Sequence, residues 1–428
     1  MTNIIGVLSF AVAVHCSFFD LPQPSEWLLN PGPNPTKNFT EREPIIELPG
    51  IGSSRLKYQF SKAHHSPKRS CPKKRTWARF WLTAQIIVPW ELPCFVENAR
   101  THYNQTTHRF YNEKGVEVEP VDFGDLAGVE NLFPPLHSFS IYEAMNKYLV
   151  KSGYTPNVDL FGAPFDFRLS IPSEMRQNGQ YSTFKKLIER VHKTTGKRVH
   201  LIGHSLGGVF SHHFLSQEVT QEWKDEHIAS LISLGTPFNG APEAIASLIA
   251  PSDFGYGIDP TILYEALRGM AGLITMIPTE PAFESNTTII KYGDLSFSSN
   301  NISKLLSLLG RTDILDARAF NLPFTTNKQH PNVTMHVLYS HRLLTPLTYA
   351  LNATNPNAVP TITGVSDGDG TVPLASLLTM PTLWKTQTKT QKKLKLKPVK
   401  IYEFEGFSHS KMLVQREVWD NILSITSK

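Results

Sequence analysis

The sequence predicts an α/β fold in which a mostly parallel β-sheet is covered by helices, and two observations predict it. First, short apolar runs typical of buried strands recur along the chain and alternate with helical patterns. These strand-like runs lie at 199–203, 228–234, 333–339 and 399–404. Second, one of them ends in a glycine-flanked turn that opens directly into a helix, as strands of such sheets do.

That turn is Gly203-His204-Ser205-Leu206-Gly207. It matches the nucleophile-elbow pattern, in which two glycines leave room for a strained strand-to-helix turn and the serine hydroxyl stands clear of the sheet. We therefore expect Ser205 to be a catalytic nucleophile. The alternative is a glycine-rich turn whose serine only caps the helix.

Length and composition describe an ordinary globular protein. The 428 residues suggest one large domain with insertions or two smaller ones, with 11% aromatic and 18% charged residues. The formal net charge of +5 is mild for this length. It is compatible with anionic lipid surfaces and does not indicate a nucleic-acid partner.

The N-terminus resembles a cleaved signal peptide. An apolar run over Ile4–Val14 is of signal-peptide length and too short to span a bilayer, although no Lys or Arg precedes it. We assign residues 1–17 to the signal and 18–428 to the mature domain. A buried N-terminal helix is the alternative. No later stretch resembles a transmembrane span.

The cysteines and sequons point in the same direction. Cys71 and Cys94 remain after cleavage, and a pair in a secreted chain suggests one disulfide, worth about 3 kcal/mol in the chain-entropy model. Asn-x-Ser/Thr sequons begin at Asn38, Asn104, Asn286, Asn301, Asn332 and Asn352. Together these features favour a secreted or organelle-lumen location.

An early strand offers an oxyanion hole. Residues 45–54 predict a short strand that runs into a glycine-bearing loop, and in α/β-hydrolases such a loop donates one backbone N–H to the oxyanion. The amide of Ile51 is the candidate, with the amide of Leu206, directly after the nucleophile, as the second donor. An ordinary strand-to-loop turn is the alternative.

Two insertions interrupt the alternation of strands and helices. Residues 61–98 combine lysines and arginines with Trp77, Phe80, Trp81 and Trp90, which suits a membrane interface. A cap packed on the core, with solvated lysines, is the alternative. Residues 250–325 are apolar without a clean period, as expected of a cap or lid over an acyl pocket.

Several polar residues are expected to be structural. Residues 158–169 predict a strand that ends in a charged turn, which Asp166 and Arg168 are expected to brace, and His212 and His213 lie in the helix after the elbow. The seven lysines between 385 and 400 predict a solvated loop, with anionic lipid contact as an alternative.

An acyl-transfer serine needs a base and an orienting acid, which in α/β-hydrolases follow in the order acid, then histidine. Asp369, in an Asp-Gly-Thr-Val-Pro turn, and His409, between the last strand and last helix, meet this order. Asp367 is the rival acid. For each residue taken singly there is a structural alternative: Asp369 as a turn residue and His409 as a helix cap. The conjunction with Ser205 predicts a serine-dependent enzyme.

No sequence motif indicates a metal-dependent, redox or nucleotide-dependent reaction. The sequence contains no His-Glu-x-x-His, Cys-x-x-Cys or phosphate-cradling Gly-x-x-x-x-Gly-Lys motif. We therefore expect neither a metal nor a cofactor.

At this point the chain resembles the lecithin–cholesterol acyltransferase family, which includes a lysosomal phospholipase A with transacylase activity. The resemblance rests on Trp27-Leu-Leu-Asn30, Pro49-Gly50, the Cys71–Cys94 loop, Ala163-Pro-Phe-Asp-Phe-Arg168, Leu201-Ile-Gly-His-Ser-Leu-Gly207, Ser233-Leu-Gly-Thr-Pro-Phe-Asn-Gly240, Gly368-Asp-Gly-Thr-Val372 and His409. It implies Ser205, Asp369 and His409 as the triad, and the amides of Ile51 and Leu206 as the oxyanion hole. It also implies a membrane-binding disulfide loop and a lid within roughly 250–285.

The implied activity is that of a phospholipid acyl hydrolase and acyltransferase at a membrane or lipoprotein surface. Alternatives are a neutral-lipid or general ester lipase, or an inactive lipid-binding protein on a retained fold. Two departures leave the acyl acceptor open. No cysteines are available for the second disulfide expected in the plasma enzymes, and Ile51 stands where the lysosomal branch has an acidic residue.

Overall fold

The computed structural model describes residues 42–427 except 67, 82, 84, 86, 87, 89, 133–139, 253–258 and 356. The expected signal peptide at 1–17 and the sequon at Asn38 lie outside these residues. Within the described part of the chain, no helix is both long enough and apolar enough to span a membrane.

The centre of the molecule is a six-stranded sheet in which every neighbouring pair is parallel. Its order is β15-β12-β9-β8-β1-β7. Their bounds are Val399–Glu405, Met335–His341, Ile228–Leu234, Val199–His204, Ile45–Leu48 and Leu160–Gly162. β1 and β8 are buried along their whole length, as expected for strands covered on both faces. The predicted α/β class is confirmed.

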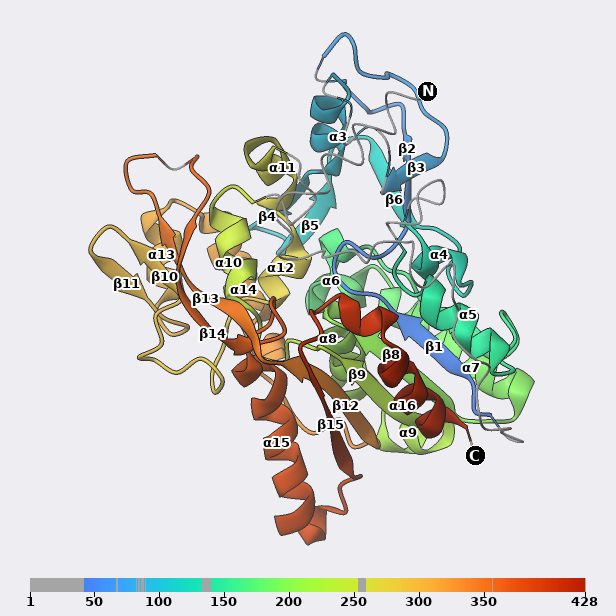
Figure 1. Cartoon of the computed structure of the whole chain (residues 1–428). Coiled ribbons are helices and arrows are strands. Elements are labelled where there is room, and N and C mark those ends of the chain that lie inside the picture. Colours follow the sequence, from blue (N-terminus) through green and yellow to red (C-terminus); the bar gives the residue numbers. More distant parts are fainter. Residues whose placement is uncertain are drawn as a thin grey trace.

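Helices cover both faces of this sheet (Figure 1). On one face α5 (Glu143–Lys151) packs against the C-terminal helix α16 (Arg416–Thr426), with the Tyr148 and Trp419 rings 5.5 Å apart. The other face carries α7 (Gln180–Thr195), α8 (Leu206–His213) and α9 (Gln221–His227). A π-helical turn, Phe214–Glu218, extends α8. Further short helical elements are α4 (Ala127–Glu130), Phe167–Leu169 and α6 (Pro172–Gln177).

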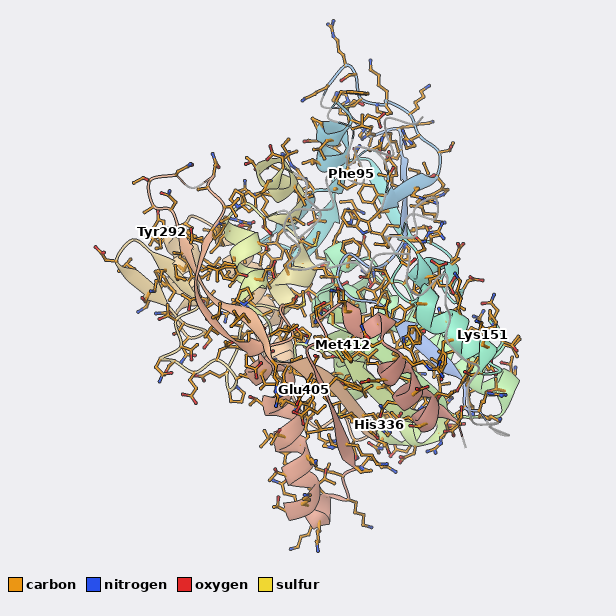
Figure 2. All side chains as sticks on the ribbon, viewed as in Figure 1. Phe95, Lys151, Tyr292, His336, Glu405 and Met412 are labelled. Carbon is orange, nitrogen blue, oxygen red and sulfur yellow. A yellow bond between two sulfur atoms is a disulfide. The ribbon has the colours of Figure 1, made fainter. Side chains whose placement is uncertain are left out.

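Residues 56–120, which we call the disulfide lobe, form a separate layer above the sheet (Figure 1). They comprise β2 (Leu56–Phe60), β3 (Ala78–Trp81), α3 (Leu92–Ala99), the hairpin β4–β5 (Thr101–Asn104 and Arg109–Asn112) and β6 (Val116–Pro120). Cys71 and Cys94 are joined, so the predicted disulfide is confirmed. Figure 2 labels Phe95 inside this lobe, where its ring lies 5.4 Å from Phe80.

Residues 250–325, which we call the cap, form a second lobe beside the sheet. Its described helices are α11 (Pro260–Leu267), α12 (Ala271–Thr275), α13 (Ile302–Leu308) and α14 (Thr312–Thr325), and α10 (Pro242–Ile249) leads into it. Its strands β10 (Ile290–Tyr292) and β11 (Leu295–Phe297) join β13 (Leu343–Leu351) and β14 (Thr361–Gly368) in a four-stranded sheet. The cap therefore shares a sheet with the chain segment that leads to Asp369.

The lysine-rich stretch differs from the expectation of a loop. Helix α15 (Leu374–Thr390) runs into it and ends in a 3-10 turn over Lys392–Leu394. The helix is anchored by the buried ring of Trp384, whose Nε1 donates to the carbonyl of Lys328 at 3.0 Å. This apolar anchor lies directly before the lysine-rich stretch and keeps the first part of the stretch helical.

Candidate active site

Ser205 stands at the junction of β8 and α8 and is almost fully buried. Its backbone adopts φ 53° and ψ −123°, a conformation that costs a non-glycine residue on the order of 1–3 kcal/mol. The neighbouring turn needs glycine, because a Cβ on Gly207 would lie 2.3 Å from the carbonyl oxygen of Leu48. The strained strand-to-helix turn that the sequence predicts is present.

Asp369 and His409 form a buried acid–base pair. His409 Nδ1 lies 2.7 Å from Asp369 Oδ2, and the two residues are 4% and 0% exposed. The other carboxylate oxygen, Oδ1, accepts the amides of Thr371 at 3.1 Å and Val372 at 2.7 Å. The His409 amide also donates to the Asp369 carbonyl at 2.9 Å. The carboxylate is thus fixed on both oxygens and orients the imidazole.

The second imidazole nitrogen is open. His409 Nε2 is buried and has no hydrogen-bond partner among the described residues. Ser205 and His409 line the same small cavity, together with Gly50, Ile51 and Leu413. Because Nδ1 is engaged by Asp369, Nε2 is the nitrogen that remains for a proton from Ser205.

The loop after β1 passes directly over the serine. A Cβ on Gly50 would lie 3.0 Å from Ser205 Cβ, so only a residue without a side chain permits this approach. Within the described residues, the amides of Ile51 and Leu206 donate no hydrogen bond. Leu206 is the first residue of α8, where a helix leaves its N–H groups unpaired. Both amides are therefore available as donors beside Ser205.

The structure corrects the expectation that Phe80 and Trp81 bind a membrane, because both are buried. The Trp81 indole Nε1 donates to the carbonyl of Gly52 at 2.6 Å and thereby anchors the loop that carries Ile51. The Phe80 ring lies 5.0 Å from the Tyr58 ring inside the lobe. Their aromatic character serves the core of the disulfide lobe.

Trp77 and Trp90 are exposed, with exposed fractions of 38% and 76%. The ammonium of Lys57 lies 4.6 Å from the centre of the Trp77 ring, an arrangement typical of a cation–π contact. Of the four aromatic residues that the sequence singles out for the membrane, these two are accessible.

His204, the residue before the nucleophile, is a site residue that the sequence analysis missed. Its Nε2 donates to the carbonyl of His409 at 3.1 Å, and the two rings lie 4.7 Å apart. Burial, assisted by the nearby His409, lowers the pKa of His204 to about 3, so the ring is neutral at physiological pH. A histidine in the variable position of the elbow motif is the signal that points to this brace.

Asp367, the rival acid, lies away from His409. Its carboxylate accepts the Arg342 amide at 2.6 Å and is 3.3 Å from His341 Nδ1. His341 also forms the one group within the described residues that offers three metal-ligand atoms close together, with Glu403 and Glu405. Arg342 pairs with Glu405 at 2.6 Å, and His341 Nε2 lies 2.8 Å from a carboxylate oxygen of Glu403.

Asp166 and Arg168 form the structural brace that the sequence predicts. Their side chains pair at 2.6 Å and are almost fully buried. Arg168 also donates to the carbonyl of Ala99 and to Asn112 Oδ1. The pair therefore ties the disulfide lobe to the end of β7.

Two named proteins are similar to this chain over most of its length. A lysosomal phospholipase A and acyltransferase of Bos taurus is 28% identical over 362 residues, which are 83% of this chain and 86% of that protein. A phosphatidylcholine-sterol acyltransferase of Homo sapiens is 26% identical over 405 residues, 93% of this chain and 89% of that protein.

Among solved structures, a chain of the Tle4–Tli4 complex superposes with a TM-score of 0.51. The match covers 90% of this chain and 98% of that one at 14% identity, and it supports the fold alone. Together with the parallel sheet and the elbow after β8, it confirms the predicted α/β-hydrolase fold. The family model described as lecithin:cholesterol acyltransferase matches residues 77–325, more than half of the sequence, so the chain belongs to the lecithin:cholesterol acyltransferase family.

Proposed function

We propose that the protein is a serine-dependent phospholipid acyl hydrolase and acyltransferase. The observation that carries the proposal is the buried His409–Asp369 pair, whose open Nε2 lines the same cavity as the strained Ser205. The names of its relatives, a phospholipase A and acyltransferase and a phosphatidylcholine-sterol acyltransferase, supply the substrate class.

In the proposed reaction, Ser205 Oγ attacks the ester carbonyl carbon of a glycerophospholipid while His409 Nε2 takes the hydroxyl proton. The amides of Ile51 and Leu206 donate to the resulting oxyanion. When the tetrahedral intermediate collapses, the ester C–O bond breaks and His409 returns the proton to the departing lysophospholipid oxygen. The acyl group remains on Ser205 as an ester.

The second half of the reaction uses the same groups. His409 deprotonates water or a lipophilic alcohol, which attacks the acyl-serine carbonyl and restores the serine. Water gives a free fatty acid, and an alcohol gives a new ester. The Asp369 carboxylate stabilises the imidazolium that forms in each half, because it is fixed 2.7 Å from Nδ1.

We propose that the disulfide lobe contacts the lipid surface through Trp77 and Trp90. Indole rings favour the headgroup region of a bilayer, and the exposed Lys73 and Lys74 of the same lobe favour anionic headgroups. The cap, residues 250–325, is proposed as the lid. The Cys71–Cys94 disulfide and the lysosomal location stated in the name of one relative favour a secreted location or the lumen of a lysosome or vacuole. There the protein would bind peripherally to membranes.

Product analysis by mass spectrometry tests the function. The full chain is incubated with mixed phospholipid vesicles, with and without a sterol, and with a triglyceride emulsion. We expect lysophospholipid together with fatty acid or acyl ester from vesicles, and much slower release from the emulsion. Faster release from triglyceride would identify a neutral-lipid lipase instead, and no product from any substrate would favour a lipid-binding protein.

A further inference from the structure

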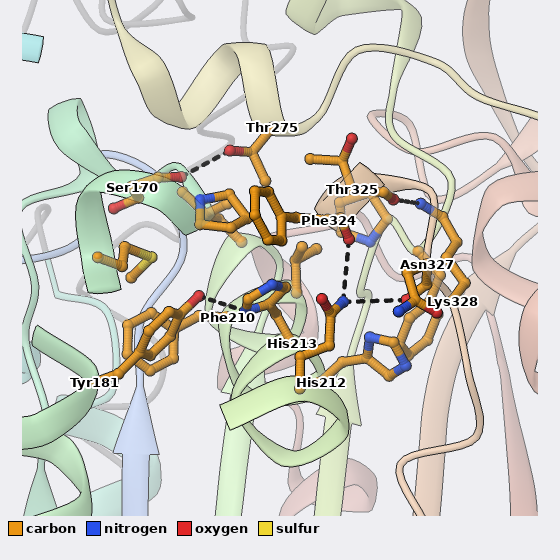
Figure 3. A pocket seen from close by; sticks show the side chains of 17 residues that line it. Ser170, Tyr181, Phe210, His212, His213, Thr275, Phe324, Thr325, Asn327 and Lys328 are labelled. Atoms are coloured by element: carbon orange, nitrogen blue, oxygen red, sulfur yellow. Dashed lines mark hydrogen bonds between the residues drawn. The ribbon is translucent and has the colours of Figure 1, made fainter. Parts of the chain in front are cut away.

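A second cleft runs along α8, between that helix and the end of the cap helix α14 (Figure 3). It encloses about 560 Å³ of empty space, part of which is open to solvent. It shares no lining residue with the cavity at Ser205. Leu206 belongs to its wall, so the cleft begins immediately behind the elbow.

One part of the cleft wall is apolar. It is formed by side chains from α6, from α8, from the loop after β9 and from the end of α14. These side chains are Met175, Leu206, Val209, Phe210, Phe238 and Phe324. Such a wall favours a hydrocarbon chain over a polar solute.

A donor without a partner lies in the same cleft. His213 is almost fully buried, and its Nδ1 is 2.8 Å from the hydroxyl of Tyr181 (Figure 3). That hydroxyl has no other acceptor among the described residues, so it donates to Nδ1, and Nε2 carries the ring hydrogen. Nε2 makes no hydrogen bond of proper geometry, although Gln217 lies near it. Burial lowers the pKa of His213 to about 3, so Nε2–H stays a neutral donor.

A cation lines the cleft as well. The ammonium of Lys328 donates to the carbonyl of Thr325, and no carboxylate lies within ion-pair distance of it in the described part of the chain. Burial lowers the pKa of Lys328 to about 8. Besides Lys328, the ammonium of Lys224 is a positive charge that acts on neighbouring His212. A half-buried ammonium without a carboxylate partner favours an anionic ligand.

We propose that this cleft binds a long-chain carboxylate. The carboxylate group matches the ammonium of Lys328 and the Nε2–H of His213, because it carries one negative charge and only accepts hydrogen bonds. The hydrocarbon chain matches the aromatic wall. The proposal does not depend on the catalytic role of Ser205, since the two cavities have no lining residue in common.

Calorimetric titration of dodecanoate, below its micelle concentration, into the full chain carrying Ser205→Ala tests the proposal. Lys328→Met in that background is expected to weaken binding about ten-fold or more, the worth of a charge-assisted hydrogen bond. Lys389→Met, which removes an exposed lysine from α15, is the matched control and is expected to change nothing. Methyl dodecanoate, which has no charge, is expected to bind both proteins equally and weakly.

Two outcomes overturn the proposal. The first is equal dodecanoate affinity with and without Lys328→Met. The second is acetate binding as tightly as dodecanoate, which would identify an anion site with no role for the chain. If Lys328→Met lowers the melting temperature, His213→Phe replaces it, with the same ten-fold loss expected. Because the protein titrated lacks the nucleophile, loss of dodecanoate binding leaves the acyl-transfer proposal standing, and the reverse also holds.

Discussion

The edge of the central sheet that carries Ser205, Asp369 and His409 contrasts with the disulfide lobe in how far a residue pattern determines the structure. At the edge, strands β8 and β15 deliver Ser205 and His409 to one cavity, and the Asp369 carboxylate is held by three donors. In the lobe, four aromatic residues of similar sequence context separate into two buried and two exposed. A motif that forms a specific backbone turn determines where its functional side chain lies. The aromatic composition of a segment does not determine which of its side chains are exposed.

The largest expected effect distinguishes the two acids at the edge. Asp369→Asn is expected to lower kcat on a short soluble ester by about 10³- to 10⁴-fold, because the imidazole loses its orienting carboxylate. Asp367→Asn is the matched control and is expected to stay within about two-fold, since Asp367 contacts Arg342 and His341. A larger loss from Asp367→Asn than from Asp369→Asn would reverse the assignment.

The exposed tryptophans of the lobe should affect only vesicle substrates. The double substitution Trp77→Ser and Trp90→Ser is expected to weaken vesicle binding by about ten-fold per residue. Each substitution removes a large apolar side chain that would otherwise be buried in the vesicle surface. Hydrolysis of a soluble ester should be unchanged. Leu394→Ser removes an exposed apolar side chain from the turn after α15 and serves as the control in a vesicle co-sedimentation assay. An equal loss on both substrates would assign these tryptophans to structure.

Trp81 links the two regions, so its substitution should affect both substrates alike. Trp81→Phe removes the hydrogen bond to the Gly52 carbonyl and loosens the loop that carries Ile51. We expect about ten-fold lower kcat on vesicles and on a soluble ester, less than the loss of an oxyanion donor. Trp223→Phe, which removes an indole bond to Glu189 away from the site, is the matched control. A loss confined to vesicles would return Trp81 to the membrane surface.

The smallest effect concerns Glu47, a completely buried residue of β1 beneath the edge. Burial raises the pKa of Glu47 well above its ordinary 4.5, Glu130 adds to this, and Asn146 opposes it. The folded state therefore keeps a proton that the unfolded chain releases, and stability declines as pH rises from the ordinary pKa toward the raised one.

Glu47→Gln should therefore raise the free energy of unfolding at pH 7.5, by on the order of 1–3 kcal/mol, and change it little at pH 4. Thermal unfolding of both proteins at the two pH values measures this difference. An equal stability difference at both pH values would show that Glu47 does not take up a proton on folding.

The sequence predicts where Ser205, Asp369 and His409 lie because the elbow, the Asp-Gly-Thr-Val-Pro turn and the last strand each have local signatures, and their catalytic roles stay a prediction. It also predicts β8, β9, β12 and β15 to within a few residues, because β8 and β9 are largely apolar and β15 carries apolar residues between charged ones. It misses the antiparallel strands of the lobe and of the β13–β14 hairpin, whose side chains are partly exposed and show no clear period. The burial of Trp81 and the brace from His204 depend on partners distant in sequence, Gly52 and His409.

The central claim is that Ser205 carries the acyl group, and fatty acid release from phospholipid vesicles by Ser205→Ala tests it most directly. The substitution removes one oxygen from a buried position, so vesicle binding and the melting temperature should match those of the unmodified protein. Release of fatty acid and of acyl ester should fall by about 10³-fold or more. Unchanged release by a folded, vesicle-bound Ser205→Ala protein would contradict the account.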